Sequence, residues 1–262
     1  MAQAVPPTTA LCALPTWRMV DFISDTHLHA GELPTFLAWQ HYMLSTPANA
    51  VFILGDLFEV WVGDDVLQDG GFQAQCARVI RQTSARCPVF FMHGNRDFLA
   101  GNGLMAACNA TLLADPSVLV FNNQRWLLSH GDALCLGDKA YMAFRQRVRS
   151  TAWQQNFLAQ PLVNRQAIAH GLRQQSQVSK QSSTQYADVD TCAARQLLQD
   201  AQALTLIHGH THQPAMHDLG GGLRRIVLSD WHVTAHAAAK LASAPRAEVL
   251  RLTHLGIERV RL

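Results

Sequence analysis

Five apolar runs in this 262-residue chain each lead into a loop with a side chain that can bind a metal. The runs and loops are 21–24 before Asp25-Thr26-His27, 51–54 before Gly55-Asp56, 88–92 before His93-Gly94-Asn95, 125–129 before His130-Gly131-Asp132, and 204–207 before His208-Gly209-His210-Thr211-His212. Short apolar runs are typical of buried strands. Ligand sites in open α/β sheets lie at the carboxyl ends of strands. The repetition therefore predicts one site at one sheet edge, because core packing does not require it.

The apolar pattern along the rest of the chain predicts an α/β protein. Helices are expected at 34–44, 72–85 and 102–109. Strands are expected at 18–24, 51–54, 88–92, 111–113, 118–121, 126–129, 204–207, 224–228, 247–252 and 257–262, with a turn at Asn122-Asn123. The later strands follow one another without helices, which favours a second sheet or a mixed one.

Two segments differ in character from the rest of the chain. Residues 1–17 contain three prolines and no charge, and are expected to be a flexible N-terminal tail rather than a signal peptide. Residues 18–262 then form one domain, with 139–199 inserted as a helical lid because no strand pattern appears there. The arginines of this lid lie either on a solvated helical face or toward a substrate, and both alternatives remain open.

Composition narrows the setting in which the protein works. The net charge of +2 provides no global electrostatic argument for nucleic acid. Six cysteines without C-x-x-C spacing indicate reduced thiols in a reducing compartment. The uncharged stretch 33–55 is interrupted by Pro34 and Pro47, so it is not expected to span a membrane. We expect a soluble or peripheral protein.

The loop 56–65 alternates acidic residues with Phe58, Val60 and Trp61. It is either a packed turn or a wall for an apolar substrate, and the pattern does not decide between them.

The five loops supply oxygen and imidazole ligands for metal ions. The seven candidates are Asp25, His27, Asp56, Asn95, His130, His210 and His212. This set suits Mn, Fe or Zn, and the absence of thiolates argues against a structural zinc site. Seven side chains are too many for one ion, whereas one bridging carboxylate would give four ligands to each of two. Two ions about 4 Å apart are suited to hydrolysis of phosphate esters and anhydrides.

Together the loops resemble the calcineurin-like metallophosphoesterase family, over roughly residues 21–230. The resemblance implies a four-layer α/β/β/α sandwich. It assigns Asp25, His27, Asp56 and His212 to one ion, and Asp56, Asn95, His130 and His210 to the other, with Asp56 bridging. It also implies catalytic roles for Asp56, Asn95, Arg96 and His210. By the same resemblance, His93 and His208 are not ligands.

Arg96 departs from the family pattern, which has a histidine that helps to protonate the leaving group or bind phosphate. Arginine stays charged and cannot donate a proton, but it binds phosphate through two hydrogen bonds. A phosphate leaving group needs no proton because its second pKa is roughly 6. Arg96 therefore favours a pyrophosphate substrate.

A closer resemblance is carried by 54–59, 93–99 and 208–214. These stretches look like the branch of the family that cleaves UDP-2,3-diacylglucosamine to UMP and 2,3-diacylglucosamine 1-phosphate in lipid A biosynthesis. This branch implies two Mn²⁺ ions, a helical lid and a cytoplasmic enzyme peripheral to the inner membrane. The implied substrate contacts are Asn95, Arg96, Asp138, Ser176, Ser179, Lys180 and His210.

Two other functions remain open at this point. One is a soluble nucleotide pyrophosphatase or phosphoesterase, which would not need an apolar lid. The other is a non-catalytic scaffold of the same family, although such scaffolds usually lose a ligand. Neither nucleic acid nor a protein partner is expected.

Overall fold

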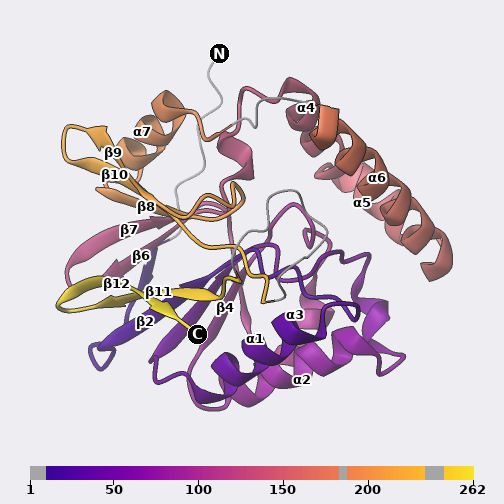
Figure 1. The fold of residues 1–262 in the computed structure, drawn as a ribbon, viewed down its shortest axis with the longest axis horizontal. Coiled ribbons are helices and arrows are strands. Elements are labelled where there is room, and N and C mark those ends of the chain that lie inside the picture. Colours follow the sequence, from indigo (N-terminus) through magenta and orange to yellow (C-terminus); the bar gives the residue numbers. More distant parts are fainter. Residues whose placement is uncertain (1–9, 183–187, 234–244) are drawn as a thin grey trace.

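Two six-stranded sheets face each other in the computed structural model, which describes residues 10–182, 188–233 and 245–262, without the side chains of 174–182 (Figure 1). The first sheet has the order β1 (Ala10–Cys12), β6 (Ser117–Phe121), β7 (Gln124–Leu128), β8 (Thr205–His208), β10 (Leu223–Val227) and β9 (Met216–Gly220). The second has the order β12 (Gly256–Arg261), β11 (Glu248–Thr253), β2 (Met19–Ile23), β3 (Ala50–Leu54), β4 (Val89–Met92) and β5 (Thr111–Leu113).

Helices cover the outer faces of both sheets, which gives the four expected layers. Along β3, Phe52 and Leu54 pack between the sheets, whereas Val51 and Ile53 pack outward, because successive strand residues point to opposite faces. The outward face is covered by α1 (Leu33–Ser45), α2 (Phe72–Ser84) and α3 (Asn102–Cys108). The other sheet is covered by α7 (Thr191–Asp200). The predicted α/β/β/α sandwich is confirmed.

The parallel strands place the ligand-bearing loops together. β2, β3 and β4 are parallel neighbours in one sheet, and β7 and β8 are parallel neighbours in the other. Each is followed by one of the five loops, so the loops gather at the carboxyl ends of strands from both sheets, rather than at the edge of one sheet as expected. The expected turn at 122–123 also forms, with φ of +53° and +58° at Asn122 and Asn123.

The N-terminal segment differs from the expected flexible tail of 1–17. Residues 1–9 lie outside the described part of the chain, but β1 pairs in parallel with β6. Trp17 is 8% exposed, and its ring contacts Phe52 and Phe90 between the sheets. Residues 10–17 are therefore part of the sandwich. The indole of Trp17 is buried there, and β1 extends the first sheet by pairing with β6. The expectation also missed β9.

The helical segment after β7 divides into two parts. Helices α4 (Lys139–Val148), α5 (Thr151–Leu158) and α6 (Leu162–Ser182) lie to the right in Figure 1, beyond the sheets. In contrast, α7 packs Ala194 and Leu198 onto Leu127 and Leu206 of the sheet. The expected lid of 139–199 is too long at its carboxyl end, since α7 belongs to an outer layer of the sandwich.

The loop 56–65 is a packed turn. Phe58 and Trp61 are 1% and 2% exposed and belong to the core beneath the helices. The indole Nε1 of Trp61 donates to Asp64 Oδ1 at 3.0 Å. Of the three apolar side chains considered, Phe58, Val60 and Trp61, Val60 alone is exposed, at 40%. The alternative of an apolar wall is therefore wrong for Phe58 and Trp61.

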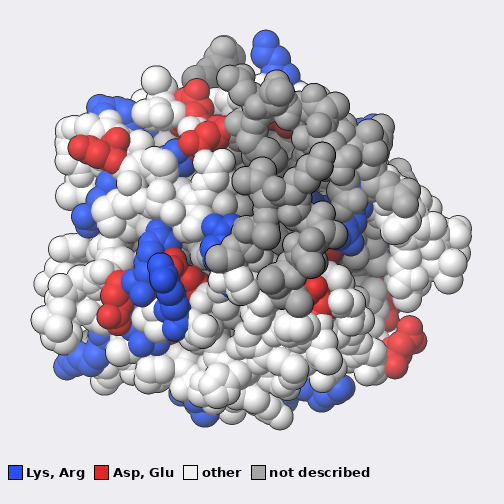
Figure 2. All heavy atoms as spheres, in the orientation of Figure 1, with Lys and Arg blue, Asp and Glu red and all other residues white. Residues whose placement is uncertain are grey.

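Several global expectations are also answered. All six cysteines lie in the described residues and are free thiols, as expected. Among the described helices, none has the length and apolarity that crossing a membrane requires. On the face drawn in Figure 2, basic and acidic side chains are interspersed among apolar and neutral ones.

Candidate metal centre

Five of the seven candidate ligands sit on left-handed backbone. Their φ angles are +52° at Asp25, +47° at His27, +52° at Asp56, +67° at His210 and +54° at His212. Such conformations cost of order 1–3 kcal/mol each outside glycine and persist where surrounding structure enforces them. Here the Asp25 and His27 amides donate to the Gly55 and Asp56 carbonyls, at 3.1 and 3.0 Å. The first two loops are thus held together by their backbones.

Asp25, His27 and His212 form the first cluster of ligand atoms. Asp25 Oδ1 lies 3.4 Å from His212 Nε2 and 4.0 Å from His27 Nε2, and the two Nε2 atoms are 3.3 Å apart. Asp25 is fully buried, yet this oxygen has no hydrogen-bond partner among the described residues. A buried carboxylate oxygen aimed between two imidazole nitrogens fits a divalent cation.

Asn95, His130 and His210 form the second cluster. Asn95 Oδ1 lies 3.0 Å from His130 Nε2 and 2.8 Å from His210 Nδ1. The Nδ1 of His130 donates to the Leu54 carbonyl at 2.9 Å, which leaves Nε2 as the available lone pair. An amide oxygen and two imidazoles therefore converge on one point.

Asp56 lies between the two clusters, as a bridging ligand would. Its Oδ2 is 4.0 Å from His27 Nε2, and its Oδ1 is 3.7 Å from His130 Nε2. The Arg96 amide donates to Oδ1 at 2.8 Å and fixes the carboxylate. The described chain thus offers two adjacent sites that share Asp56, which fits the predicted pair of ions.

The charges around the centre also favour cations. Burial would lower the pKa of His130, but Asp56, Asp25 and Asp132 raise it to about 9. Burial would raise the pKa of Asp25, yet the imidazoles of His212, His130 and His27 hold this pKa well below its ordinary value. An arrangement that favours a proton on a fully buried imidazole also favours a metal ion at that place.

Gly94 shows why these loops need glycine. A Cβ at this position would overlap the carboxylate and amide of Asp56. The third loop can therefore approach the second only where the side chain is absent.

Sequence reasoning missed the side chains that support the ligands. Asp97 is fully buried and accepts hydrogen bonds from the amides of Gly94, Asp56 and Leu57. Burial and Asp56 raise the pKa of its carboxyl to about 6. Its position directly after Asn95-Arg96 was the only local signal.

A second missed support joins the centre to α4. Asp132 Oδ2 accepts from Tyr141 Oη at 2.6 Å and from Arg145 Nε at 2.8 Å. The Tyr141 ring stacks on His210, with 5.9 Å between ring centroids. These partners are nine or more residues from Asp132, so local pattern did not show them.

The other expected residues have different placements. Asp138 caps α4 by accepting from the Tyr141 amide at 2.9 Å. Ser176, Ser179 and Lys180 belong to α6, but their side chains lie outside the described part of the structure. His93 Nε2 donates to the Ala100 carbonyl at 2.6 Å, and His208 is buried with its pKa lowered to about 4 by burial. Both are hydrogen-bonded away from the two clusters.

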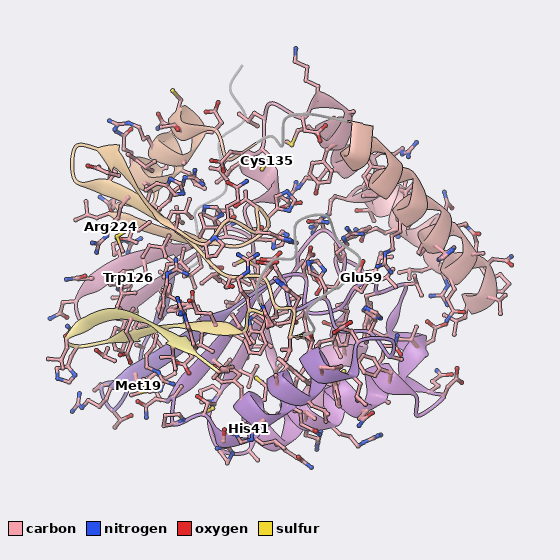
Figure 3. All side chains as sticks on the ribbon, in the orientation of Figure 1. Met19, His41, Glu59, Trp126, Cys135 and Arg224 are labelled. Atoms are coloured by element: carbon pink, nitrogen blue, oxygen red, sulfur yellow. The ribbon has the colours of Figure 1, made fainter. Side chains whose placement is uncertain are left out.

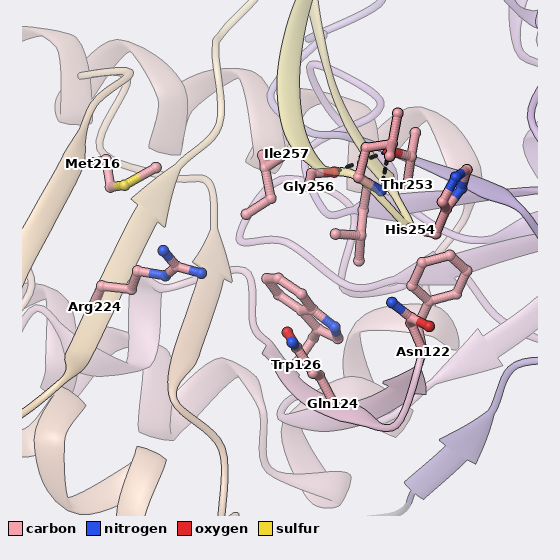
Figure 4. Close-up of a pocket in the computed structure, with 12 residues that line it drawn as sticks. Asn122, Gln124, Trp126, Met216, Arg224, Thr253, His254, Gly256 and Ile257 are labelled. Atoms are coloured by element: carbon pink, nitrogen blue, oxygen red, sulfur yellow. Dashed lines mark hydrogen bonds between the residues drawn. The ribbon is translucent and has the colours of Figure 1, made fainter.

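A separate hollow lies at the other edge of the sheets. It has a volume of about 350 Å³ and is lined by Trp126, Arg224 and the β11–β12 turn (Figure 4). Gln124, which also lines it, begins β7, whereas His130 follows the carboxyl end of that strand. The hollow is therefore remote from the ligand-bearing loops.

This fold and this centre define a class of protein. Residues 19–214 match the family described as calcineurin-like phosphoesterase, and the chain belongs to that family. Its relatives include proteins named UDP-2,3-diacylglucosamine hydrolase. The one from Chromobacterium violaceum is 45% identical over 223 residues, covering 81% of this chain and 90% of the relative. The one from Cellvibrio japonicus is 42% identical, covering 80% and 90%. The one from Ralstonia nicotianae is 42% identical over 245 residues, covering 89% and 88%.

Proposed function

We propose that this chain hydrolyses the pyrophosphate of UDP-2,3-diacylglucosamine to UMP and 2,3-diacylglucosamine 1-phosphate. One observation carries the proposal. Seven ligand-type side chains converge at the carboxyl ends of strands from both sheets, in a chain 45% identical to a relative named UDP-2,3-diacylglucosamine hydrolase. The same relative is covered over 90% of its length, so the similarity includes the helices beside the centre.

The two clusters would hold two Mn²⁺ ions. Asp25, His27 and His212 would bind one, Asn95, His130 and His210 the other, and Asp56 both. Mixed carboxylate, amide and imidazole ligands suit this metal. Bound ions would supply Lewis-acid activation of water and would neutralise charge on the phosphoryl oxygens.

Arg96 is assigned to the phosphates. Its backbone is fixed by the bond from its amide to Asp56, and its side chain is 20% exposed beside the centre. A guanidinium there would bind two phosphoryl oxygens in the same plane. Since it cannot donate a proton, the leaving group must depart as a stable anion, which a phosphate does. Asn95 and His210 would complete the phosphate contacts.

Helices α4, α5 and α6 would form the lid over the substrate. Asp138, Ser176, Ser179 and Lys180 are assigned to the sugar and nucleotide. A groove of about 170 Å³ lies between α6 and the 56–66 segment. Its apolar side, formed by Val60, Val62, Val66 and Ala169, suits hydrocarbon, and its polar side is formed by Gln73, Gln166, His170 and Arg173. The exposed side chains of Leu158 on α5 and Ile168 on α6 would favour attachment of the lid to the cytoplasmic face of the inner membrane.

The test is hydrolysis by the Mn²⁺-loaded protein, followed by ³¹P NMR and mass spectrometry of the products. UDP-2,3-diacylglucosamine, deacylated UDP-glucosamine and UDP-N-acetylglucosamine form the substrate panel, and Asn95→Ala serves as the inactive control. We expect UMP and the lipid 1-phosphate from the acylated substrate only. Equal turnover of all three compounds would instead indicate a general nucleotide pyrophosphatase.

A further inference from the structure

Glu59 lies at the junction of three parts of the molecule. Its amide donates to the Leu28 carbonyl at 3.2 Å, which places it beside the loop of His27. Two residues later, the Trp61 amide donates to the Arg96 carbonyl at 3.0 Å. In Figure 3, Glu59 appears between the carboxyl edge of the strands and α6. The residue is 8% exposed, so its surroundings are protein rather than solvent.

The two oxygens of Glu59 face different partners. Oε2 lies 3.2 Å from Nδ1 of His27. Oε1 lies 2.9 Å from Nε of Arg173 on α6 and 3.8 Å from a terminal nitrogen of Arg96. One carboxylate therefore joins a candidate metal ligand, the arginine assigned to the phosphates and a lid helix.

We propose that Glu59 is a positioning residue that couples docking of α6 to the affinity of the first metal site. A carboxylate next to Nδ1 keeps the proton there and directs the Nε2 lone pair of His27 toward the metal. The same carboxylate attracts Arg173, so the arrangement that orients His27 also holds α6 in place. Coupling of this kind is reciprocal: metal binding strengthens the docking of α6, and docking strengthens metal binding.

Asp65 provides a matched control. It also binds α6, since both its oxygens accept from Arg165. In the part of the chain that the structure describes, the Asp65 carboxylate forms its ion pair with Arg165 and none with His27 or Arg96. Loss of Asp65 thus removes one attachment of α6 without disturbing the surroundings of the ligands. The two carboxylates separate a merely structural role from a coupled one.

The experiment measures Mn²⁺ affinity by titration of the unloaded full chain and amide exchange in 162–173 with and without Mn²⁺. Glu59→Ala should weaken Mn²⁺ binding at one site by about 10–100-fold, which is typical when a histidine loses its carboxylate partner. It should also abolish the protection of α6 that Mn²⁺ confers. Asp65→Asn should speed exchange in α6, and because Glu59 keeps α6 docked most of the time in this variant, Mn²⁺ affinity should stay within twofold.

Two further variants keep the proposal testable. Glu59→Gln has the same shape, so it decides the question if Glu59→Ala fails to fold, and it should lose about tenfold in Mn²⁺ affinity. Adding Arg173→Ala to Glu59→Ala should not loosen α6 further, because the pair acts as one unit. Unchanged Mn²⁺ affinity in folded Glu59→Gln, or Mn²⁺ protection of α6 that survives in it, would overturn the coupling.

The inference rests on the proposed function only for the phosphate contact of Arg96. The titration and the exchange measurement use no substrate, so a wrong substrate assignment leaves them intact. In turnover, Asp65→Asn should raise KM alone, whereas Glu59→Gln should also lower kcat. Equal KM and kcat effects of the two variants would reduce Glu59 to an ordinary lid contact.

Discussion

The Nε2 atoms of His27 and His212 lie 3.3 Å apart, and each faces Oδ1 of Asp25. Two imidazole nitrogens and a carboxylate oxygen at these distances are held together most favourably by a cation among them.

The loaded protein should contain two Mn²⁺ ions per chain, and Asp56→Ala should lose more than one of them. The reason is that Asp56 presents one oxygen to each cluster, at 4.0 Å from His27 Nε2 and 3.7 Å from His130 Nε2. Metal analysis after gel filtration measures this, with the exposed Asp69→Ala as control. Retention of two ions by Asp56→Ala would exclude a bridging role.

Arg96→Ala should lower kcat/KM by about 10–100-fold, because a charged hydrogen bond contributes roughly 1.5–3 kcal/mol. It should keep both ions, since Arg96 fixes Asp56 through its backbone amide. Arg96→His should gain activity on aryl or alkyl phosphoesters, because an imidazolium can protonate the departing aryloxide or alkoxide. The surface variant Arg78→Ala is the control, and unchanged pyrophosphatase kinetics in Arg96→Ala would contradict the phosphate contact.

Shortening each acyl chain by two methylenes should lower kcat/KM more than tenfold, because each buried methylene contributes about 0.8 kcal/mol. Val60→Asn should weaken this dependence, since Val60 is 40% exposed and lines the groove under α6. Val163→Asn, at a position 73% exposed, is the control with the same change. Equal kcat/KM for substrates with long and short acyl chains would contradict acyl-chain binding in this groove.

Phe157→Ala should destabilise the protein by about 3–5 kcal/mol, the usual cost of truncating a buried phenylalanine. Phe157 is 5% exposed and stacks on Trp153 with 4.8 Å between centroids, so it belongs to the core. Leu158→Ala, at 42% exposure, should change stability by less than about 0.5 kcal/mol. Denaturant unfolding measures both, and equal values would place Phe157 outside the core.

Acid should loosen α6 in part through Asp65. Hydrogen bonds from Arg165 lower the pKa of this carboxyl below its ordinary value of 3.8. The stabilisation is therefore fully present above pH 3.8 and is lost as pH falls through the lower, folded-state pKa. Amide exchange in 162–173, corrected for its intrinsic pH dependence, should rise at pH 3 relative to pH 5. Asp65→Asn should reduce that rise, with the remainder due to Glu59, which also holds α6 through Arg173. An undiminished rise in Asp65→Asn would contradict the role of Asp65.

The clustering of the candidate ligands could be predicted from the sequence because each strand end is marked locally. An apolar run followed by Gly-Asp or His-Gly identifies both the strand and the side chain that it delivers. The support for these ligands was not readable, because it depends on contacts between distant residues. Arg165 and Asp65 are one hundred residues apart in the sequence, and Glu59 and Arg173 are farther apart still.

Burial was also hidden where local pattern was ambiguous. Phe58 and Trp61 alternate with acidic residues, a pattern that also fits a strand or an apolar surface for a substrate. In the structure, the backbone of Phe58 pairs with Leu28 and its side chain lies in the core. The three residues of β1 carry too little pattern to predict a strand. Their partner β6 is more than one hundred residues away.

The candidate ligands come from both sheets: Asp25, His27, Asp56 and Asn95 follow strands of one, while His130, His210 and His212 follow strands of the other. Each ion would therefore act as a cross-link between the two halves of the sandwich. The free energy of ion binding then adds to the free energy of unfolding, by about 2.7 kcal/mol for each ion at a concentration one hundred times its Kd. The melting temperature of this protein would thus report metal occupancy, and chelators in a storage buffer would shorten its storage life as well as lower its activity.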